Sequence, residues 1–294
     1  METKTFVLKD GRNLAYEEFG DPKGVPVFHA HGGPGSRLEG GWFHDMAMKE
    51  GFRVIATDRP GFGESSYKPD RKHGDYARDI AELADSLRID KFGVMGWSGG
   101  GMPTTICAHV IPDQLLFSFS FAGYTNWGQM PDAPSYLAGG RDNFENASTM
   151  YKLSGIEGFE KSLKAMEDRL KADPEEAYAL IISQLNETDR AIAGKSPFKK
   201  LFIQSQLEAF KQGSLGPGHD GWLHCQDWGF RLEDIAFPIH VFHGTADGLV
   251  PIEYAKHLRD KVPDCTLTIW DGEGHFAAQD HMEEIFGLAG RAIS

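Results

Sequence analysis

The segment G-W-S-G-G at residues 96–100 constrains the fold of this 294-residue chain more than any other. The apolar run before it, residues 91–95, predicts a short buried strand. The small residues after it, 101–109, predict a helix with Pro103 in its first turn. A strand, a tight turn and a helix are the setting in which a G-x-S-x-G motif forms a nucleophile elbow, with Ser98 strained and its hydroxyl free at the end of the strand.

The motif alone is weak evidence, because the chain contains 35 glycines and short motifs match by chance. An ordinary strand-to-helix turn would carry the same residues. In an elbow, Gly96 and Gly100 are required, since a Cβ at either position would collide with the opposite arm of the turn. The remainder of the chain therefore decides between a simple turn and a catalytic site.

Segments that predict strands alternate with segments that predict helices around this motif. Strands are predicted at 5–9, 13–19, 26–31, 53–57, 91–95, 115–122, 238–242 and 266–270. Helices are predicted at 37–49, 76–87, 101–109, 252–261 and 282–292. The first two strands enclose a turn and form a hairpin. The alternation that follows predicts an α/β fold, with a mostly parallel sheet covered by helices on both faces.

This alternation stops between residues 124 and 231, where the sequence is mainly helical. Helices are predicted there at 159–172, from Asp173-Pro174 onward, and from Ser196 to Gly213. We therefore expect an α/β core formed by residues 1–123 and 232–294, interrupted by a helical cap at residues 124–231. The apolar faces of the cap helices need a partner, and the nearest one is the catalytic edge of the core.

A serine hydroxyl needs an adjacent base, and the base needs an acid that fixes its tautomer. In this type of fold the order along the chain is serine, acid, histidine, each at the end of a strand. Asp247 and His275 follow the last two predicted strands. Either has another interpretation, since Asp247 is also typical of a helix cap and the chain has twelve histidines, of which His243 is interpreted as structural. The order and placement together favour a triad of Ser98, Asp247 and His275.

The sequence H-G-G-P-G-S at residues 31–36 directly follows another predicted strand. Acyl transfer develops negative charge on the carbonyl oxygen, and preorganised N–H groups stabilise that charge. The elbow supplies one N–H from Gly99, and the glycine loop is placed to supply a second from Gly33. A simple turn is one alternative. A phosphate loop is another, but no Gly-Lys-Ser/Thr follows these glycines.

Together these segments resemble the α/β-hydrolase superfamily over nearly the whole chain. The resemblance rests on the H-G-G-P-G-S loop, on D-R-P-G-F-G-E-S at 58–65, on the G-W-S-G-G elbow and on the loops of Asp247 and His275. It implies that the third residue of the H-G-G-P-G-S loop donates to the oxyanion and that 58–65 is structural support. Segments 212–216 and 228–235 resemble the end of the cap in a functionally mixed bacterial group, so the resemblance identifies the fold better than the substrate.

The chain departs from several branches of that superfamily. Haloalkane dehalogenases and epoxide hydrolases carry aspartate at the elbow, which Ser98 excludes. Proline iminopeptidases share the H-G-G-P-G loop, but they place tryptophan after the serine, whereas here Trp97 precedes it. Such a peptidase would also need cap acids for the substrate's ammonium group, and the candidates are Glu145, Glu157 and Glu208.

The composition of the chain argues against several classes of binding partner. A formal net charge of −13 argues against nucleic acid as a partner. No apolar stretch approaches the ~20 residues of a membrane span, the N-terminus does not resemble a signal peptide, and three widely spaced cysteines fit a cytoplasmic protein. No segment matches a cofactor motif, no metal site is expected, and the sequence carries no prediction of oligomeric state. Candidate aromatic pocket residues in the cap are Tyr124, Trp127, Tyr136, Phe144, Trp222 and Trp228.

The sequence thus predicts a serine hydrolase that cleaves small, largely apolar carboxylic esters through an acyl-enzyme, without a cofactor. In this hypothesis Ser98 attacks, His275 moves the proton, Asp247 orients His275, and the N–H groups of Gly33 and Gly99 hold the oxyanion. One alternative is an amide hydrolase like the proline iminopeptidases. Another is a non-catalytic ligand-binding protein on the same fold.

Overall fold

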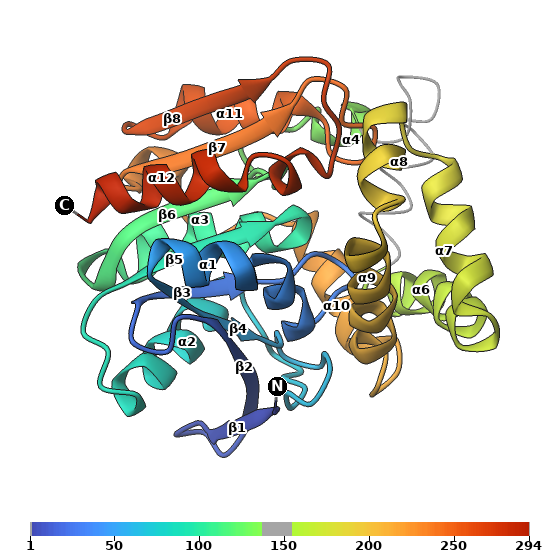
Figure 1. Cartoon of the computed structure of the whole chain (residues 1–294), viewed down its shortest axis with the longest axis horizontal. Coiled ribbons are helices and arrows are strands. Elements are labelled where there is room, and N and C mark those ends of the chain that lie inside the picture. The colour runs from blue at the N-terminus through green and yellow to red at the C-terminus, as the bar shows by residue number, and fades with distance from the viewer. Residues whose placement is uncertain (1, 137–154, 294) are drawn as a thin grey trace.

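The computed structural model of the chain describes residues 2–136 and 155–293 (Figure 1). Its centre is an eight-stranded sheet with the order β1-β2-β4-β3-β5-β6-β7-β8. The strands are β1 (Lys4–Val7), β2 (Asn13–Gly20), β3 (Val25–Ala30), β4 (Phe52–Thr57), β5 (Phe92–Trp97), β6 (Leu115–Phe121), β7 (Ile239–Gly244) and β8 (Cys265–Trp270). The predicted hairpin forms between β1 and β2, and β2 is also antiparallel to β4. All the other pairs are parallel, so the α/β-hydrolase fold predicted from the sequence is confirmed.

Helices cover both faces of this sheet. On one face lie α1 (His44–Glu50) and α12 (Met282–Ala292), and on the other lie α2 (Asp75–Ser86), α3 (Gly101–Val110) and α11 (Ile252–Lys261) (Figure 1). The strand residues alternate between the two resulting cores: on β5, Met95 packs in the core beneath α1 and α12, and Val94 packs in the core beneath α2, α3 and α11. Every residue of β5 is buried, as expected for a central parallel strand.

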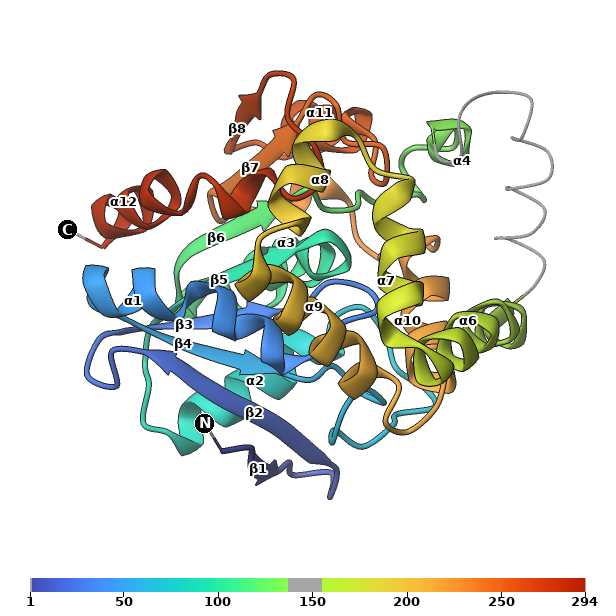
Figure 2. The ribbon, with the colours of Figure 1, turned by 45° about the vertical axis from the view of Figure 1, so that its right-hand side comes forward.

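The predicted cap segment contains a group of helices that lies beyond the carboxyl ends of the strands (Figure 2). They are α4 (Ala133–Tyr136), α6 (Gly155–Ala172), α7 (Pro174–Ser183), α8 (Glu187–Ala193), α9 (Ser196–Ala209) and α10 (Leu215–His224). The cap has a small core of its own, but other cap side chains share a core with the sheet. Phe198, for example, stacks on Trp42 with the two rings 4.9 Å apart. The division into core and cap stays our proposal.

Two helices differ from the sequence expectation. The segment predicted as one helix at 37–49 is a 3₁₀ helix at Arg37–Phe43 followed by α1. The backbone of this segment lies very close to the sheet: a Cβ added to Gly40 would be only 2.6 Å from the ring of Phe19. The helix α9 ends at Ala209 rather than at Gly213, because Phe210 leaves helical geometry and the chain continues in a turn in which the amide of Gly213 donates to the carbonyl oxygen of Phe210. Asp173, by contrast, caps α7 as predicted, with its carboxylate accepting from the amide of Glu176.

Within the described ranges, no helix combines the length and the apolar character that crossing a bilayer requires.

Candidate active site

Ser98 lies between β5 and α3, where the sequence predicted a nucleophile elbow. Its φ angle is 55°, in the left-handed region that residues other than glycine adopt only under constraint. The neighbouring glycines allow this turn: a Cβ on Gly96 would overlap the carbonyl oxygen of Gly100, and a Cβ on Gly100 would overlap that of Ala30. Both overlaps involve backbone atoms, so no side-chain rotation relieves them. Ser98 is therefore fixed at the carboxyl end of β5, with 8% of its surface exposed.

Asp247 and His275 come from the loops after β7 and β8, and the fold brings them together. Nδ1 of His275 lies 2.7 Å from Oδ2 of Asp247. An ionised carboxylate only accepts, so Nδ1 carries the proton and Nε2 is left as the acceptor. Oδ1 of Asp247 accepts from the amides of Leu249 (2.8 Å) and Val250 (2.9 Å). The aspartate therefore caps its own loop while it orients the histidine.

The charge of Asp247 is stabilised although its side chain is fully buried. Burial raises the pKa of this carboxyl group, but His275 and His243 outweigh that effect and hold its pKa well below the ordinary 3.8. Nε2 of His243 lies 3.3 Å from Oδ2 of Asp247 and 2.8 Å from the carbonyl oxygen of Val250. The interpretation of His243 as merely structural is therefore incomplete, because this ring lies against the candidate acid.

His275 is anchored to the residue that precedes Ser98. The indole Nε1 of Trp97 donates to the carbonyl oxygen of His275 at 2.9 Å, and the two rings lie 5.0 Å apart. Across residues 2–136 and 155–293, no hydrogen bond joins Ser98 directly to His275. In enzymes without substrate such contacts are often long, and they shorten in the reacting complex. The predicted acid and base are paired, and they lie at the same edge of the sheet as Ser98.

The two predicted oxyanion donors, Gly33 and Gly99, lie side by side. A Cβ built on Gly99 would be 3.1 Å from the amide nitrogen of Gly33. The C=O and N–H groups of one trans peptide point in opposite directions. The carbonyl oxygen of Gly32 accepts from Nη2 of Arg59 at 3.0 Å, so the N–H of Gly33 points away from that guanidinium. Arg59, which belongs to the supporting segment 58–65, thereby orients a backbone donor.

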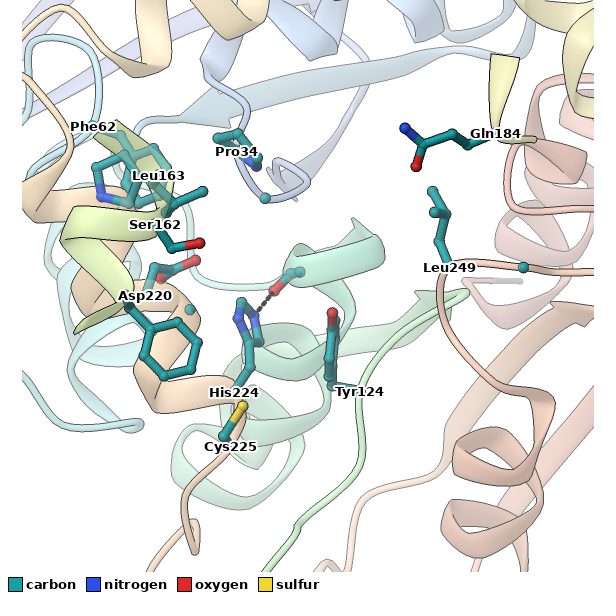
Figure 3. Close-up of a pocket in the computed structure, with 16 residues that line it drawn as sticks. Pro34, Phe62, Tyr124, Ser162, Leu163, Gln184, Asp220, His224, Cys225 and Leu249 are labelled. Carbon is teal, nitrogen blue, oxygen red and sulfur yellow. Dashed lines mark hydrogen bonds between the residues drawn. The ribbon is translucent and has the colours of Figure 1, made fainter. Parts of the chain in front are cut away.

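Hydrogen bonds fix both of the peptide units that flank Gly99. The carbonyl oxygen of Ser98 accepts from the amide of Gly101, so the N–H of Gly99 points the other way. The carbonyl oxygen of Gly99 accepts from Nε2 of His224 at 2.9 Å (Figure 3). The ring of His224 stacks on Tyr124, with the ring centres 4.6 Å apart. A cap histidine for which we predicted no catalytic role therefore contacts the elbow itself.

A buried ion cluster lies behind the glycine loop. Nη2 of Arg59 lies 2.7 Å from a carboxylate oxygen of Asp220 on α10, and Arg71 donates to the same carboxylate at 3.0 Å. Burial raises the pKa of Asp220, but the two guanidinium groups outweigh it and hold that pKa well below 3.8. Burial lowers the pKa of His224, which keeps its ring neutral at pH 7. The cluster joins core to cap, and the glycine loop also contacts a second buried carboxylate, that of Glu39, which accepts from the amide of Gly32 at 2.7 Å.

A cavity of ≈ 560 Å³ opens between core and cap beside these glycines (Figure 3). Its floor includes Gly33 and Gly99. Its apolar side chains come from Pro34, Phe62, Phe159, Leu163, Pro217, Cys225 and Leu249. Its polar side chains come from Tyr124, Ser162, Gln184, Asp220 and His224. The cavity therefore presents a mixed lining rather than the largely apolar one that the sequence led us to expect.

The candidate pocket aromatics and acids mostly lie elsewhere. Of the aromatic residues, Tyr124 lines the cavity, Trp127 and Trp228 are packed in cores, Tyr136 is exposed, Trp222 is half-buried, and Phe144 lies outside the described residues. Of the acids, Glu157 is exposed, Glu208 pairs with Arg37 at 2.8 Å, and Glu145 lies outside the described residues. Among the described residues, no group of three or more His, Cys, Asp or Glu side chains is placed to hold a metal ion.

Comparison with known proteins identifies the family. The model of the alpha/beta hydrolase family matches residues 27–288, so the chain belongs to this family and is an α/β-hydrolase enzyme. A proline iminopeptidase of Xylella fastidiosa is 26% identical over 290 residues, covering 92% of this chain and 89% of that protein. A 2-hydroxy-6-oxononadienedioate/2-hydroxy-6-oxononatrienedioate hydrolase of Burkholderia vietnamiensis is 26% identical over 290 residues, covering 94% and 90%.

A solved structure shows the same fold at lower sequence identity. The esterase from Exiguobacterium antarcticum aligns with a TM-score of 0.71 and 18% identity, covering the whole of both chains. At this level of identity the likeness establishes the fold alone. The relatives differ in the bond that they hydrolyse, so the substrate has to be argued from the site of this chain.

Proposed function

We propose that this protein is a serine hydrolase that cleaves small carboxylic esters through an acyl-enzyme. The observation that carries the proposal is the positive φ of Ser98 at the end of β5, directly beside the paired glycines of the predicted oxyanion site. The hydrogen bond between His275 and Asp247 supports it, because a serine needs a base whose tautomer is fixed.

The proposed reaction proceeds in two stages. Oγ of Ser98 forms a bond to the ester carbonyl carbon while its proton passes to Nε2 of His275, and Asp247 stabilises the imidazolium. The carbonyl oxygen becomes an oxyanion, which accepts hydrogen bonds from the N–H groups of Gly33 and Gly99. The intermediate then expels the alcohol, which takes the proton from His275. Water, activated by the same histidine, hydrolyses the acyl-enzyme and restores Ser98.

The cavity supports a small substrate of mixed polarity. Its volume of ≈ 560 Å³ falls within the range of ordinary small-molecule sites, roughly 300–1,000 Å³. Phe62 and Leu163 offer apolar contacts, whereas Tyr124 and His224 add polar atoms to the lining, and Nε2 of His224 contacts the elbow at Gly99. We therefore propose short-chain esters, and we extend the expected class to acyl or alcohol groups that carry a hydroxyl or a carbonyl. The three widely spaced cysteines favour a cytoplasmic location for such an enzyme.

The proline iminopeptidase alternative is less well supported. Recognition of a free amino terminus requires an acidic group in the pocket. Among the described residues, Asp220 is the acid that lines the cavity, but two arginines already share its carboxylate. An ammonium group placed there would compete with two guanidinium groups for one carboxylate. The ester reaction does not require this recognition, and the same triad performs it.

A substrate panel with a matched variant tests the proposal. We expect the wild-type protein to hydrolyse p-nitrophenyl acetate and butyrate faster than proline p-nitroanilide, and to act weakly on a vinylogous 1,5-diketone of the kind that the Burkholderia relative's name implies. Ser98→Ala should lower kcat by a factor on the order of 10⁶, because attack and proton transfer are lost together. Ester turnover by Ser98→Ala at more than a hundredth of the wild-type rate would refute Ser98 as the nucleophile.

A further inference from the structure

A cap side chain binds the backbone of the loop that carries His275. The carboxylate of Asp189, on α8, accepts from the amide of His275 at 2.9 Å through Oδ2 and from the amide of Phe276 at 2.7 Å through Oδ1. Asp189 has none of its surface exposed. Both oxygens of one buried carboxylate are thus committed to two successive N–H groups, and the first belongs to the candidate base itself.

Helix α8 packs closely against the loop that carries His275. A Cβ on Gly274, the residue before His275, would overlap both Oδ2 of Asp189 and Nδ2 of Asn186. The glycine at this position is therefore explained by the cap rather than by the turn alone. Any shift of α8 would remove the two acceptors from the histidine loop.

Asn186, the residue that caps the N-terminus of α8, also contacts the loop of the candidate acid. Nδ2 of Asn186 donates to the carbonyl oxygen of Ala246, the residue before Asp247, at 2.6 Å. Oδ1 of Asn186 accepts from the amide of Asp189 at 2.8 Å, which fixes the two cap side chains relative to each other. The acid loop and the histidine loop are further joined by the amide of Ala246, which donates to the carbonyl oxygen of Glu273 at 2.8 Å.

The ionisable groups around Asp189 distinguish its contact with the histidine loop from a hydrogen bond that only holds a loop in place. In residues 2–136 and 155–293 its carboxylate forms no ion pair with lysine or arginine, and the ionisable groups that face it are His275 and Asp247, with His243 behind the latter. A buried carboxylate so placed stabilises the positive charge that develops on the nearby imidazole during the proposed proton transfer.

We propose that Asp189 is a positioning residue for His275, so that the base is correctly placed only when the cap is seated on the core. This inference rests on the proposed function and deepens it. The cap is then part of the proton-transfer apparatus, because Asp189 fixes the backbone of the base while Asp247 fixes its ring. Asp189 does not touch the substrate in this proposal, and it acts through the histidine.

The variant Asp189→Asn tests this role, because it keeps the shape of the side chain but turns one acceptor into a donor that faces an N–H group. We expect kcat for ester hydrolysis to fall about 10- to 100-fold with KM nearly unchanged, since small displacements of a catalytic group have effects of this size. We also expect the acid limb of the pH–kcat profile to move to lower pH, because a negative charge next to the base is lost. A merely structural contact would move neither readout in the folded protein.

The matched control is Asp173→Asn. Asp173 also accepts a backbone amide in the cap, that of Glu176 at 2.9 Å, but it lies at the start of α7 and does not contact the histidine loop. Its substitution should leave kcat and the pH profile within twofold of wild type. If Asp189→Asn, shown to be folded by circular dichroism, also keeps wild-type kcat and pH profile, the proposal is wrong.

Hydrogen exchange on the unmodified protein gives a second test that needs neither a folded variant nor ester turnover. The amides of His275 and Phe276 should exchange as slowly as those within α8, because they share its carboxylate. Exchange at the rate of an open loop, while α8 stays protected, would overturn the proposal. Ser98→Ala should retain the same protection, so failure of the proposed function and failure of this inference give different results.

Discussion

The core and the cap place the polar groups of the candidate site by different means. On the core side, Ser98, Gly33 and Gly99 are positioned by strand ends and by glycines that leave no room for a Cβ. On the cap side, Asp189 and Asp220 are positioned by hydrogen bonds and ion pairs to groups that belong to the core. Backbone geometry thus positions the functional groups of the core, whereas contacts of buried carboxylates position those of the cap. Side chains of the proposed cap thus contact the loops of the candidate acid and base in addition to lining the cavity.

The largest effect should come from the core side. Asp247→Asn keeps an acceptor for the amides of Leu249 and Val250 but favours the wrong tautomer of His275. We expect kcat to fall by about 10⁴, with the fold intact. Steady-state kinetics and a thermal melt measure the two quantities. Asp271→Asn, at an exposed carboxylate just after β8, is the matched control and should keep full activity. Near-normal kcat in Asp247→Asn would remove Asp247 from the proposed triad.

On the cap side the expected effect is on stability. Asp220→Asn leaves Arg59 and Arg71 buried with too little negative charge, and losing one partner of a buried ion pair destabilises a protein by about 3–5 kcal/mol. Urea denaturation measures this change. The control is Lys195→Ala, which removes an exposed ion pair with Asp280 that also joins cap to core and should matter by about 1 kcal/mol or less. If the two variants lose the same free energy of unfolding, the buried charges are not what stabilises the contact between cap and core.

A third, slightly smaller effect tests the glycine loop. A Cβ on Gly32 would lie 2.7 Å from the ring of Trp97, so Gly32→Ala must displace the peptide that carries the N–H of Gly33. Loss of one oxyanion donor lowers kcat about 10²- to 10³-fold, and KM should change little. Gly290→Ala in α12, where a Cβ meets open space, is the control. If Gly32→Ala keeps wild-type kcat, the oxyanion site lies elsewhere.

The smallest effect is the acid dependence of stability. The pKa values of Asp220 and Asp247 lie below the ordinary 3.8, so the unfolded chain binds more protons at these sites, and their stabilisation is lost as pH falls below about 4. Burial raises the pKa of Asp58 and Asp189, which gives the opposite sign at those two sites. Comparing urea denaturation at about pH 5 and pH 3 isolates Asp220, because Asp220→Asn should lose less stability than wild type over this interval. A greater loss in the variant would contradict the ion cluster.

These regions also differ in how far the sequence predicts them. Strands and helices of the core follow from apolar periodicity, and the elbow follows from a motif in the correct local setting. The order of Ser98, Asp247 and His275 could be recognised because each follows a predicted strand. All of this information is local, and it needs only the rule that carboxyl ends of parallel strands share one edge of a sheet.

The cap contributions could not be read in the same way. Arg59 and Asp220 are 161 positions apart, and Asp189 and His275 are 86 apart, with no shared motif between the partners. His224 stands among other ionisable residues, and nothing in its spacing marks it as a neighbour of Gly99. The sequence contains only indirect evidence for the ion cluster. A buried arginine in the D-R-P-G segment needs a carboxylate partner, and in the structure that carboxylate belongs to Asp220 of the cap.

The most direct measurement of the central claim is covalent labelling with a fluorophosphonate, followed by mass spectrometry of the modified peptide. The account predicts one label per chain on Oγ of Ser98, together with loss of ester turnover in proportion to labelling. It also predicts slow labelling of Asp247→Asn and none of Ser98→Ala. Full ester turnover after stoichiometric labelling, or a label on a different residue that abolishes turnover, would contradict the assignment of Ser98 as the nucleophile.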